Sequence, residues 1–165
     1  MFVLLGRQID EIEACIKEVD AKLSAAHKAS ELSQRLITIP GVGPIIALTL
    51  AVEIDPAMFE SGRHLAAWAG LTPKERSTGG KQRMGGISRA GNERLRALLV
   101  SGATSVINHA MRPGSKLMTE WMRALLQRKL AAVALANKIA RTAWAMMRSG
   151  ETYRRPSAAA GAAAA

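Results

Sequence analysis

The residues best suited to chemistry lie in one basic, glycine-rich segment, Lys74–Arg96. Within it, Ser77 is followed by Thr78 and two glycines and has lysines and arginines on both sides. A serine hydroxyl is a weak nucleophile unless a base removes its proton or cations stabilise the charge that develops on the attacked group. Ser77 is therefore a candidate nucleophile toward a phosphate. The alternative is a turn residue, which is the commoner role of a serine beside two glycines.

The charge of this segment indicates a polyanionic partner. Seven of its 23 residues are Lys or Arg and two are Glu, so it holds half of the chain's net charge of +10. A glycine-rich loop with many cations can follow a phosphate backbone, with an affinity that falls as salt rises. A solvated surface loop is the alternative. The predicted DNA contacts in the segment are Lys74, Arg76, Lys81, Arg83, Arg89, Arg94 and Arg96.

A second candidate contact is the turn around Gly41 and Gly43. The run Ile39-Pro40-Gly41-Val42-Gly43-Pro44 has the hydrophobic-Gly-hydrophobic-Gly pattern of helix-hairpin-helix elements. In such elements the backbone N–H groups that start the second helix reach a phosphate. Gly41 and Gly43 are therefore predicted to contact DNA, although Pro44 removes one donor. A plain tight turn between packed helices is the alternative.

Other catalytic chemistries find little support in the sequence. It contains neither a Walker loop nor a Gly-x-Ser-x-Gly elbow. The three histidines have no spacing typical of a triad or a metal site, and the acidic residues between Asp10 and Glu13 lie on the polar face of a predicted helix. The single cysteine, Cys15, allows no internal disulfide and no zinc cluster. We therefore predict no metal site in this chain and a reducing cytosol as its location.

The element nearest the N-terminus is predicted to be a helical arm. Between Ile9 and Ala26 the apolar residues recur at alternating spacings of three and four, and most other positions are charged. This heptad pattern favours pairing with another helix, from this chain or from a second copy. An amphipathic helix that lies on the chain's own core is the alternative.

The rest of the chain also favours helices. They are predicted over Pro44–Ile54, Gly62–Gly70, Asn92–Ala110, Lys116–Gln127 and Ala131–Ser149, the last with Asn137 on a polar edge. Thr72–Ala90 has no sustained period, and no alternating β-rich run is present. We expect an all-α helical bundle with a coiled-coil-like arm and a helix-hairpin-helix-like element.

Several classes of protein are excluded or disfavoured. The longest uncharged stretch, Leu36–Val52, is broken by Pro and Gly and is short for a bilayer span, so no membrane partner is expected. Only six residues are aromatic, which disfavours a surface that stacks bases on a row of rings. The alanine-rich residues 154–165 are predicted to be a disordered tail.

Four blocks in a fixed order resemble the C-terminal domain of transposases of the insertion sequence 110 (116/902) family. The blocks are Leu36–Pro44, Leu65–Pro73, Ser77–Lys81 with Gly86–Asn92, and Val133–Lys138. The resemblance implies an oligomeric recombinase that moves a DNA element, in some members with a structured guide RNA. Family members carry a metal-binding RuvC-like domain, followed by a helical domain whose serine forms a phosphoserine link to DNA.

The resemblance assigns roles to parts of this chain. Residues 1–34 would be the linking helix or coiled-coil arm, and residues 35–153 the DNA-binding domain. Ser77 matches the family's serine, but Thr78 is an alternative because many relatives have Ser-Ser-Gly or Ser-Gly here. The protein is expected to act in bacterial cytoplasm at the nucleoid.

The chain departs from the family pattern because it begins in the linking helix, without the acidic domain. Mg²⁺ would be needed only together with that domain, and no cofactor is expected in this chain. We therefore expect DNA binding without complete transposition, as a truncated gene product or as half of a split enzyme. The alternative is a non-catalytic helix-hairpin-helix DNA-binding module or a transposase regulator.

Overall fold

The computed structural model describes residues 2–75, 84–115, 120–127 and 131–154. In chain order the elements are α1 (Phe2–Ala29), α2 (Glu31–Leu36), α3 (Pro44–Glu53), the 3-10 helix η1 (Pro56–Met58), α4 (Gly62–Trp68), β1 (Pro73–Glu75), β2 (Met84–Ile87), α5 (Glu93–Ala110), α6 (Glu120–Gln127) and α7 (Ala131–Ser149). The predicted mostly helical fold is confirmed. The two strands were not predicted, because such short runs of Pro, Gly and charged residues carry no alternating pattern.

Local sequence explains where the helices of the body begin. α2, α4 and α5 start after Ser30, Ser61 and Asn92, respectively. In each case the side-chain oxygen accepts a hydrogen bond from the backbone N–H three residues later. This contact satisfies one of the donors that a helix start leaves free. α3 instead begins with Pro44, whose missing N–H costs nothing in the first turn.

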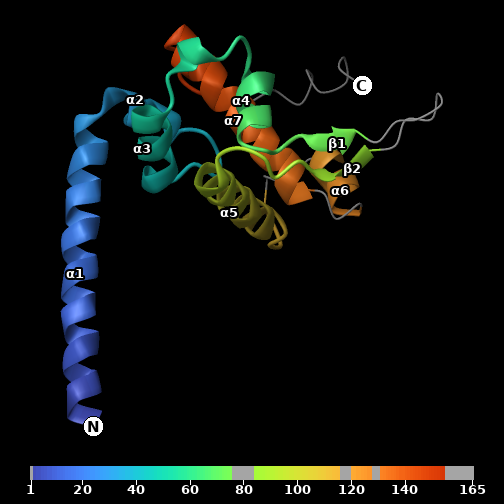
Figure 1. Cartoon of the computed structure of the whole chain (residues 1–165). Helices are drawn as coiled ribbons and strands as arrows, with labels where there is room; N and C mark the ends of the chain where they lie inside the picture. The colour runs from blue at the N-terminus through green and yellow to red at the C-terminus, as the bar shows by residue number, and fades with distance from the viewer. Residues whose placement is uncertain (1, 76–83, 116–119, 128–130, 155–165) are drawn as a thin grey trace.

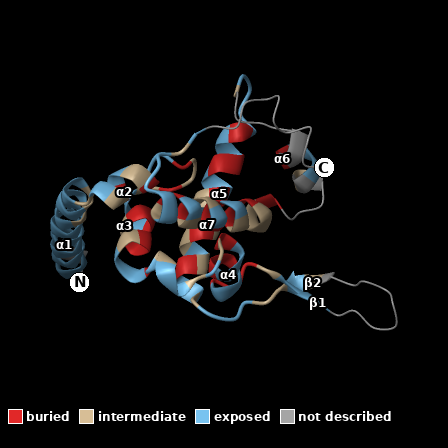
Figure 2. Cartoon of the chain, turned by 90° about the horizontal axis from the view of Figure 1, so that it is seen from above, coloured by how far each residue is buried: buried red, intermediate tan, exposed pale blue. Residues whose placement is uncertain are grey.

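The core lies where α7 packs against α5 on one side and α4 on another, with α3 against α5. Figure 2 shows the buried residues gathered on the facing sides of these helices. Large side chains with no exposed surface come from α2, α3, α4 and α5 and include Leu36, Leu50, Leu65, Leu95 and Leu99. Burial of such apolar surface is the main term that stabilises the fold.

α1 extends away from this body (Figures 1 and 2). Its main contacts are with α2 and α3 at its C-terminal end. Four residues of the heptad seam are largely exposed: Ile9 (57%), Ile12 (60%), Ile16 (54%) and Val19 (59%). The alternative in which this seam packs on the chain's own core is therefore wrong. The prediction that it pairs with another helix is left open.

Polar contacts hold the base of the arm and the end of the chain together. His27 Nδ1 lies 2.7 Å from the hydroxyl of the buried Ser33, across the break between α1 and α2. Arg35 on α2 donates to the carbonyl of Gly150, at 2.5 Å, just after α7. The two ends of the body are thus linked at the point from which the arm extends.

Candidate nucleic-acid interface

β1 and β2 form a short antiparallel stem on the side of the body away from α1 (Figure 1). Pro73 pairs with Ile87, and Glu75 pairs with Met84, so the chain leaves and rejoins the stem at one place. Lys74, the first predicted DNA contact, is exposed on β1. The predicted nucleophile and its neighbours lie outside the described residues: Arg76, Ser77, Thr78, Lys81 and Arg83.

Backbone hydrogen bonds attach the base of the stem to α4 and α5. After β2, three backbone N–H groups donate to carbonyls that lie just before β1. Ser88 bonds to Thr72 (2.8 Å), Arg89 to Gly70 (3.3 Å) and Asn92 to Trp68 (3.2 Å). Because Asn92 also caps α5 and Trp68 ends α4, these bonds join the end of one helix to the start of the other. The stem therefore rises from a defined part of the body.

Two glycines are required for this close approach. Gly70 and Gly91 have φ of 72° and 79°, a region that residues with side chains rarely adopt. A Cβ added at Gly91 would lie 1.7 Å from the carbonyl oxygen of Trp68, and one at Gly70 would lie 2.2 Å from that of Ala90. A side chain at either position would force the two segments apart.

Arg96, a predicted DNA contact, also bridges this junction. Its Nη1 donates to the carbonyls of Ala69 (3.1 Å) and Ala90 (3.3 Å), on the two sides of the stem base. From α7, the side-chain amide of Asn137 donates to the carbonyl of Leu71 at 3.4 Å. Asn137 was predicted on a polar edge, but its partner Leu71 was not predicted. The hydrogen bonds of Arg96 and Asn137 hold the base of the stem on the body.

The other predicted cations differ in their surroundings. Arg89 is exposed and has φ of 54°, which is uncommon for a residue with a side chain. Arg94 lies 3.1 Å from the carboxylate of Glu53 on α3, although its side chain is 71% exposed. Part of the Arg94 charge is therefore offset within the body, whereas Arg89 forms no ion pair with another of the described residues.

The glycine turn at Gly41 and Gly43 connects α2 to α3, as expected, but Gly41 faces inward. Its φ is 90°, and an added Cβ would lie 2.9 Å from the carbonyl oxygen of Gly102 in α5. Around Gly43, by contrast, an added Cβ would meet nothing within 4 Å. Gly102 is about 15 Å along α5 from Asn92, at 1.5 Å per residue. The turn and the stem thus contact different parts of α5.

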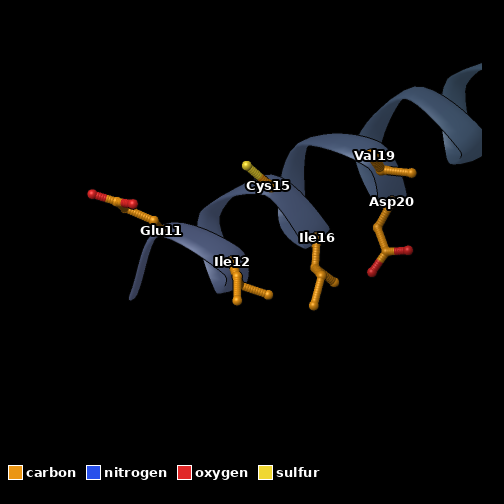
Figure 3. A pocket seen from close by; sticks show the side chains of 6 residues that line it. All are labelled: Glu11, Ile12, Cys15, Ile16, Val19 and Asp20. Atoms are coloured by element: carbon orange, nitrogen blue, oxygen red, sulfur yellow. The ribbon is translucent and has the colours of Figure 1, made fainter. Parts of the chain in front are cut away.

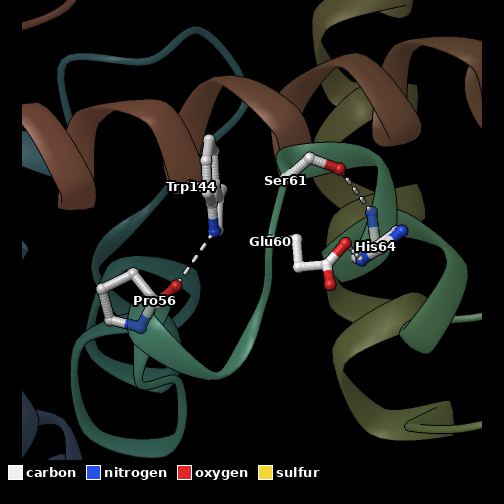
Figure 4. A network of polar contacts seen from close by, with 5 residues as sticks. All are labelled: Pro56, Glu60, Ser61, His64 and Trp144. Carbon is white, nitrogen blue, oxygen red and sulfur yellow. Dashed lines mark hydrogen bonds and ion pairs between the residues drawn. The ribbon is translucent and has the colours of Figure 1, made fainter.

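α4, which supports the stem, packs closely on α7, and α7 also holds η1, just before α4, by a side-chain hydrogen bond (Figure 4). A Cβ added at Gly62 would lie 2.9 Å from the Cα of Arg141, so the two helices approach closely here. Just before α4, the indole of Trp144 donates to the carbonyl of Pro56 at 3.1 Å. His64 lies 3.6 Å from the carboxylate of Glu60 on the exposed side.

Among the described residues, no three His, Cys, Asp or Glu side chains come together in a way that could hold a metal ion. These residues therefore do not fit a Mg²⁺ centre. None of the helices in the described ranges combines the length and apolarity needed to cross a bilayer.

The sequence of this chain matches a family of known proteins. Residues 33–127 match the model of the transposase IS116/IS110/IS902 family. The chain is 52% identical over 158 residues to y4pF/y4sB of Sinorhizobium fredii, provisionally named a transposase, covering 93% of this chain and 41% of that protein. It is 39% identical over 146 residues to the transposase for insertion sequence element IS1111A of Coxiella burnetii, covering 86% and 40%.

A third relative, the transposase for insertion sequence element IS1328 of Yersinia enterocolitica, is 39% identical over 142 residues, covering 84% of this chain and 42% of that protein. The chain thus spans less than half the length of these relatives. Since the family match covers more than half of its residues, the chain belongs to the IS116/IS110/IS902 family of transposases.

Proposed function

We propose that this chain is the DNA-binding, serine-bearing part of an insertion-sequence transposase. The carrying observation is the stem: it is tied to α4 and α5 at its base, and its paired ends flank the residues that contain Ser77. Half of the chain's net charge lies in the same stretch, Lys74–Arg96. A cationic segment attached to a well-anchored base is suited to presenting a nucleophile to a phosphate backbone.

In the proposed reaction the Ser77 oxygen attacks a backbone phosphorus. The Oγ–P bond forms as the bond from phosphorus to one deoxyribose oxygen breaks, and the serine proton is transferred by way of solvent to that leaving oxygen. One phosphodiester is exchanged for another, so a hydroxyl from a second strand can reverse the step and join that strand. Arg76, Lys81 and Arg83 would stabilise the charge that develops on the phosphate oxygens.

A covalent protein–DNA adduct tests the serine. The chain is incubated with a labelled oligonucleotide from the element's end, with and without the N-terminal part of a full-length relative, and run on a denaturing gel. We expect an adduct with wild type and Thr78→Ala, and none with Ser77→Ala. Loss with Thr78→Ala alone would instead assign the nucleophile to Thr78.

Two results would reject the catalytic proposal. One is an adduct that survives both substitutions. The other is a wild-type chain that binds DNA but forms no adduct even with the N-terminal part supplied, which would leave a DNA-binding module or transposase regulator as the function.

The phosphate contacts are tested by the salt dependence of DNA affinity. Each phosphate neutralised adds about 0.9 to the slope of log affinity against log salt, so Lys74→Ala and Arg89→Ala should each reduce the slope by about that amount. Lys17→Ala, on the exposed arm, is the matched control and should leave the slope unchanged. A wild-type affinity that barely changes with salt would contradict the proposal.

A structured RNA is the second proposed partner. It should compete with DNA in the same binding assay.

The turn at Gly43 is proposed as a second phosphate contact, through the open backbone at the start of α3. Gly41 supports it by allowing the turn to pack on Gly102. Gly43→Glu should weaken DNA binding by adding a negative charge there, and Gly43→Ala should bind as wild type. If Gly43→Glu binds DNA normally, the turn makes no phosphate contact.

We also propose that α1 pairs with the same helix of a second copy. Figure 3 shows Ile12 and Ile16 pointing to the same side of α1, along an apolar surface that they share with Val19. Ile16→Glu would place a charge in this seam and should give a monomer by sedimentation equilibrium. Ala21→Glu, on the polar side of α1, should keep the oligomer. A wild-type chain that stays monomeric at all concentrations rejects the pairing.

A further inference from the structure

Trp68 presents an aromatic ring at the surface, next to the base of the stem. It is the last residue of α4 and is 40% exposed. The other aromatic side chains whose burial the structure describes, Phe59, Trp144 and Tyr153, are partly buried against the core. An indole ring with this much exposed surface offers a flat apolar face that a planar partner can cover. The proposed transesterification does not use this ring.

The position of Trp68 is fixed by contacts on both its backbone and its side chain. Its carbonyl accepts the N–H of Asn92 at 3.2 Å, and Gly91 packs directly against that carbonyl. Its ring packs T-shaped on Phe59, with ring centres 5.7 Å apart and planes 67° apart. A ring held in this way loses little conformational freedom when a planar partner stacks on it.

Polar and charged side chains lie on the elements next to the ring. His64, one turn earlier, is on the same face of α4 and lies beside the carboxylate of Glu60, and Arg63 is exposed next to it. The stem attached at Trp68 carries the exposed Lys74 and Arg89. An apolar ring at the base of a cationic stem matches a ligand that combines a planar face with a negative charge. A nucleotide has both features, and stacked aromatic rings with basic neighbours are how proteins hold unpaired strands.

We propose that Trp68 stacks on an unpaired base of the strand whose phosphates contact the stem. This inference rests on the proposed DNA binding and adds to it a contact with a base. Because strand exchange unpairs bases near the cut, a single ring at the base of the stem is suited to holding one of them. The scarcity of aromatic residues disfavours a row of stacking rings but is compatible with a single one.

The test compares Trp68→Leu, which keeps apolar volume without a π face, with Trp68→Phe, which keeps the face. Affinities are measured by fluorescence anisotropy for labelled 20-nucleotide single strands of DNA and RNA and for duplex DNA. We expect Trp68→Leu to weaken single-strand binding by about 5- to 150-fold, which corresponds to about 1–3 kcal/mol per stacked base. Trp68→Phe should bind nearly as wild type, and duplex affinity and the salt slope should change little in either variant.

Val52→Ala is the matched control, because Val52 is an exposed apolar residue (79%) on α3, away from the stem. It should bind single strands as wild type. Thermal unfolding of every variant separates lost stacking from lost folding. An effect on RNA alone would support stacking and assign the base to RNA, and an effect on DNA strands would assign it to DNA.

Single-strand binding by Trp68→Leu at the wild-type affinity overturns the stacking proposal while leaving DNA binding intact. The stacking proposal is also overturned if Trp68→Leu and Trp68→Phe weaken single-strand binding equally, or if a variant weakens duplex and single-strand binding equally. In either case the ring would act through packing within the protein. A wild-type chain that binds no DNA overturns both this inference and the proposed function.

Discussion

α1 and α7 both carry an apolar stripe, but only that of α7 is covered. In α7 the residues Leu135, Ile139 and Met146 are buried, and alanines between them let α4 and α5 approach closely. In α1 the stripe is narrow, charged residues flank it, and Ile12 is 60% exposed. A broad stripe with small residues suits packing from several sides, whereas a narrow heptad stripe suits one partner helix.

The difference implies that the two regions gain stability from different sources. The body buries its core within one chain, so its free energy of unfolding should not depend on protein concentration. α1 buries little apolar surface within the chain, so the stability of the arm should depend on association with a second copy. Substitutions at matched positions in the two regions test this.

The largest expected difference is between two large-to-small substitutions. Leu99 in α5 has no exposed surface, so Leu99→Ala should lower the free energy of unfolding of the body by about 2–5 kcal/mol. Ile16→Ala on the arm should change it by less than about 0.5 kcal/mol but should weaken self-association. Urea unfolding at two protein concentrations measures both effects. A large loss of body stability in Ile16→Ala would show that the arm packs on the body.

Two helical glycines provide the next comparison. A Cβ at Gly102 in α5 would lie 2.0 Å from the carbonyl oxygen of Gly41, so Gly102→Ala should cost about 1–3 kcal/mol despite the better helix propensity of alanine. Around Gly6 in α1 nothing lies within 4 Å. Gly6→Ala should therefore stabilise the helix α1 by about 0.5–1 kcal/mol and so raise the helix content. Thermal unfolding followed by circular dichroism measures both, and stabilisation by Gly102→Ala would contradict the packing described.

A smaller effect is expected at the cap of α5. The Asn92 side chain accepts the N–H of Leu95 at 2.9 Å, so Asn92→Ala should cost about 1 kcal/mol. Ser24 on the arm lies inside a helix, and Ser24→Ala should be neutral or slightly stabilising. Chemical unfolding distinguishes the two. Equal effects at both positions would mean that Asn92 does not act as a cap.

The smallest effects are expected for two ion pairs. Lys22–Glu18 on the arm (2.6 Å) is mainly exposed, and in Arg94–Glu53 of the body (3.1 Å) Arg94 is 71% exposed and Glu53 33%. Glu53→Gln and Glu18→Gln should each cost less than about 1 kcal/mol, and the cost should shrink at high salt. Unfolding at two ionic strengths measures this. A cost that salt does not reduce would indicate a hydrogen-bonding role for the carboxylate.

Helices with strong local signals were predicted closely. The prediction for Ala131–Ser149 has the same bounds as α7, and Asn92 was predicted at the start of the helix that it caps. α1 extends beyond the heptad pattern of Ile9–Ala26 in both directions, from Phe2 to Ala29. The stem was missed because Pro73–Glu75 is too short and Met84–Ile87 too rich in glycine for a strand pattern.

Only part of the candidate site was predicted, because its contacts join segments that are far apart in the sequence. The concentration of charge in Lys74–Arg96 follows from composition alone. Arg96 and Arg89 look equivalent in the sequence, yet Arg96 donates to two backbone carbonyls while Arg89 is exposed. Spacing along the chain does not show which cation finds carbonyls from a distant segment. Whether Ser77 acts as a nucleophile stays a prediction.

Most of the helices, the heptad stripe, the placement of charge and the family follow from the sequence alone, because each depends on neighbouring residues or on the order of motifs. Which apolar stripe is covered, and which glycine touches which helix, depends on contacts between distant segments. Gly41 meets Gly102, and Gly91 meets Trp68, across long stretches of chain. Such contacts form only when separate helices pack, and packing depends on the shapes of both surfaces at once.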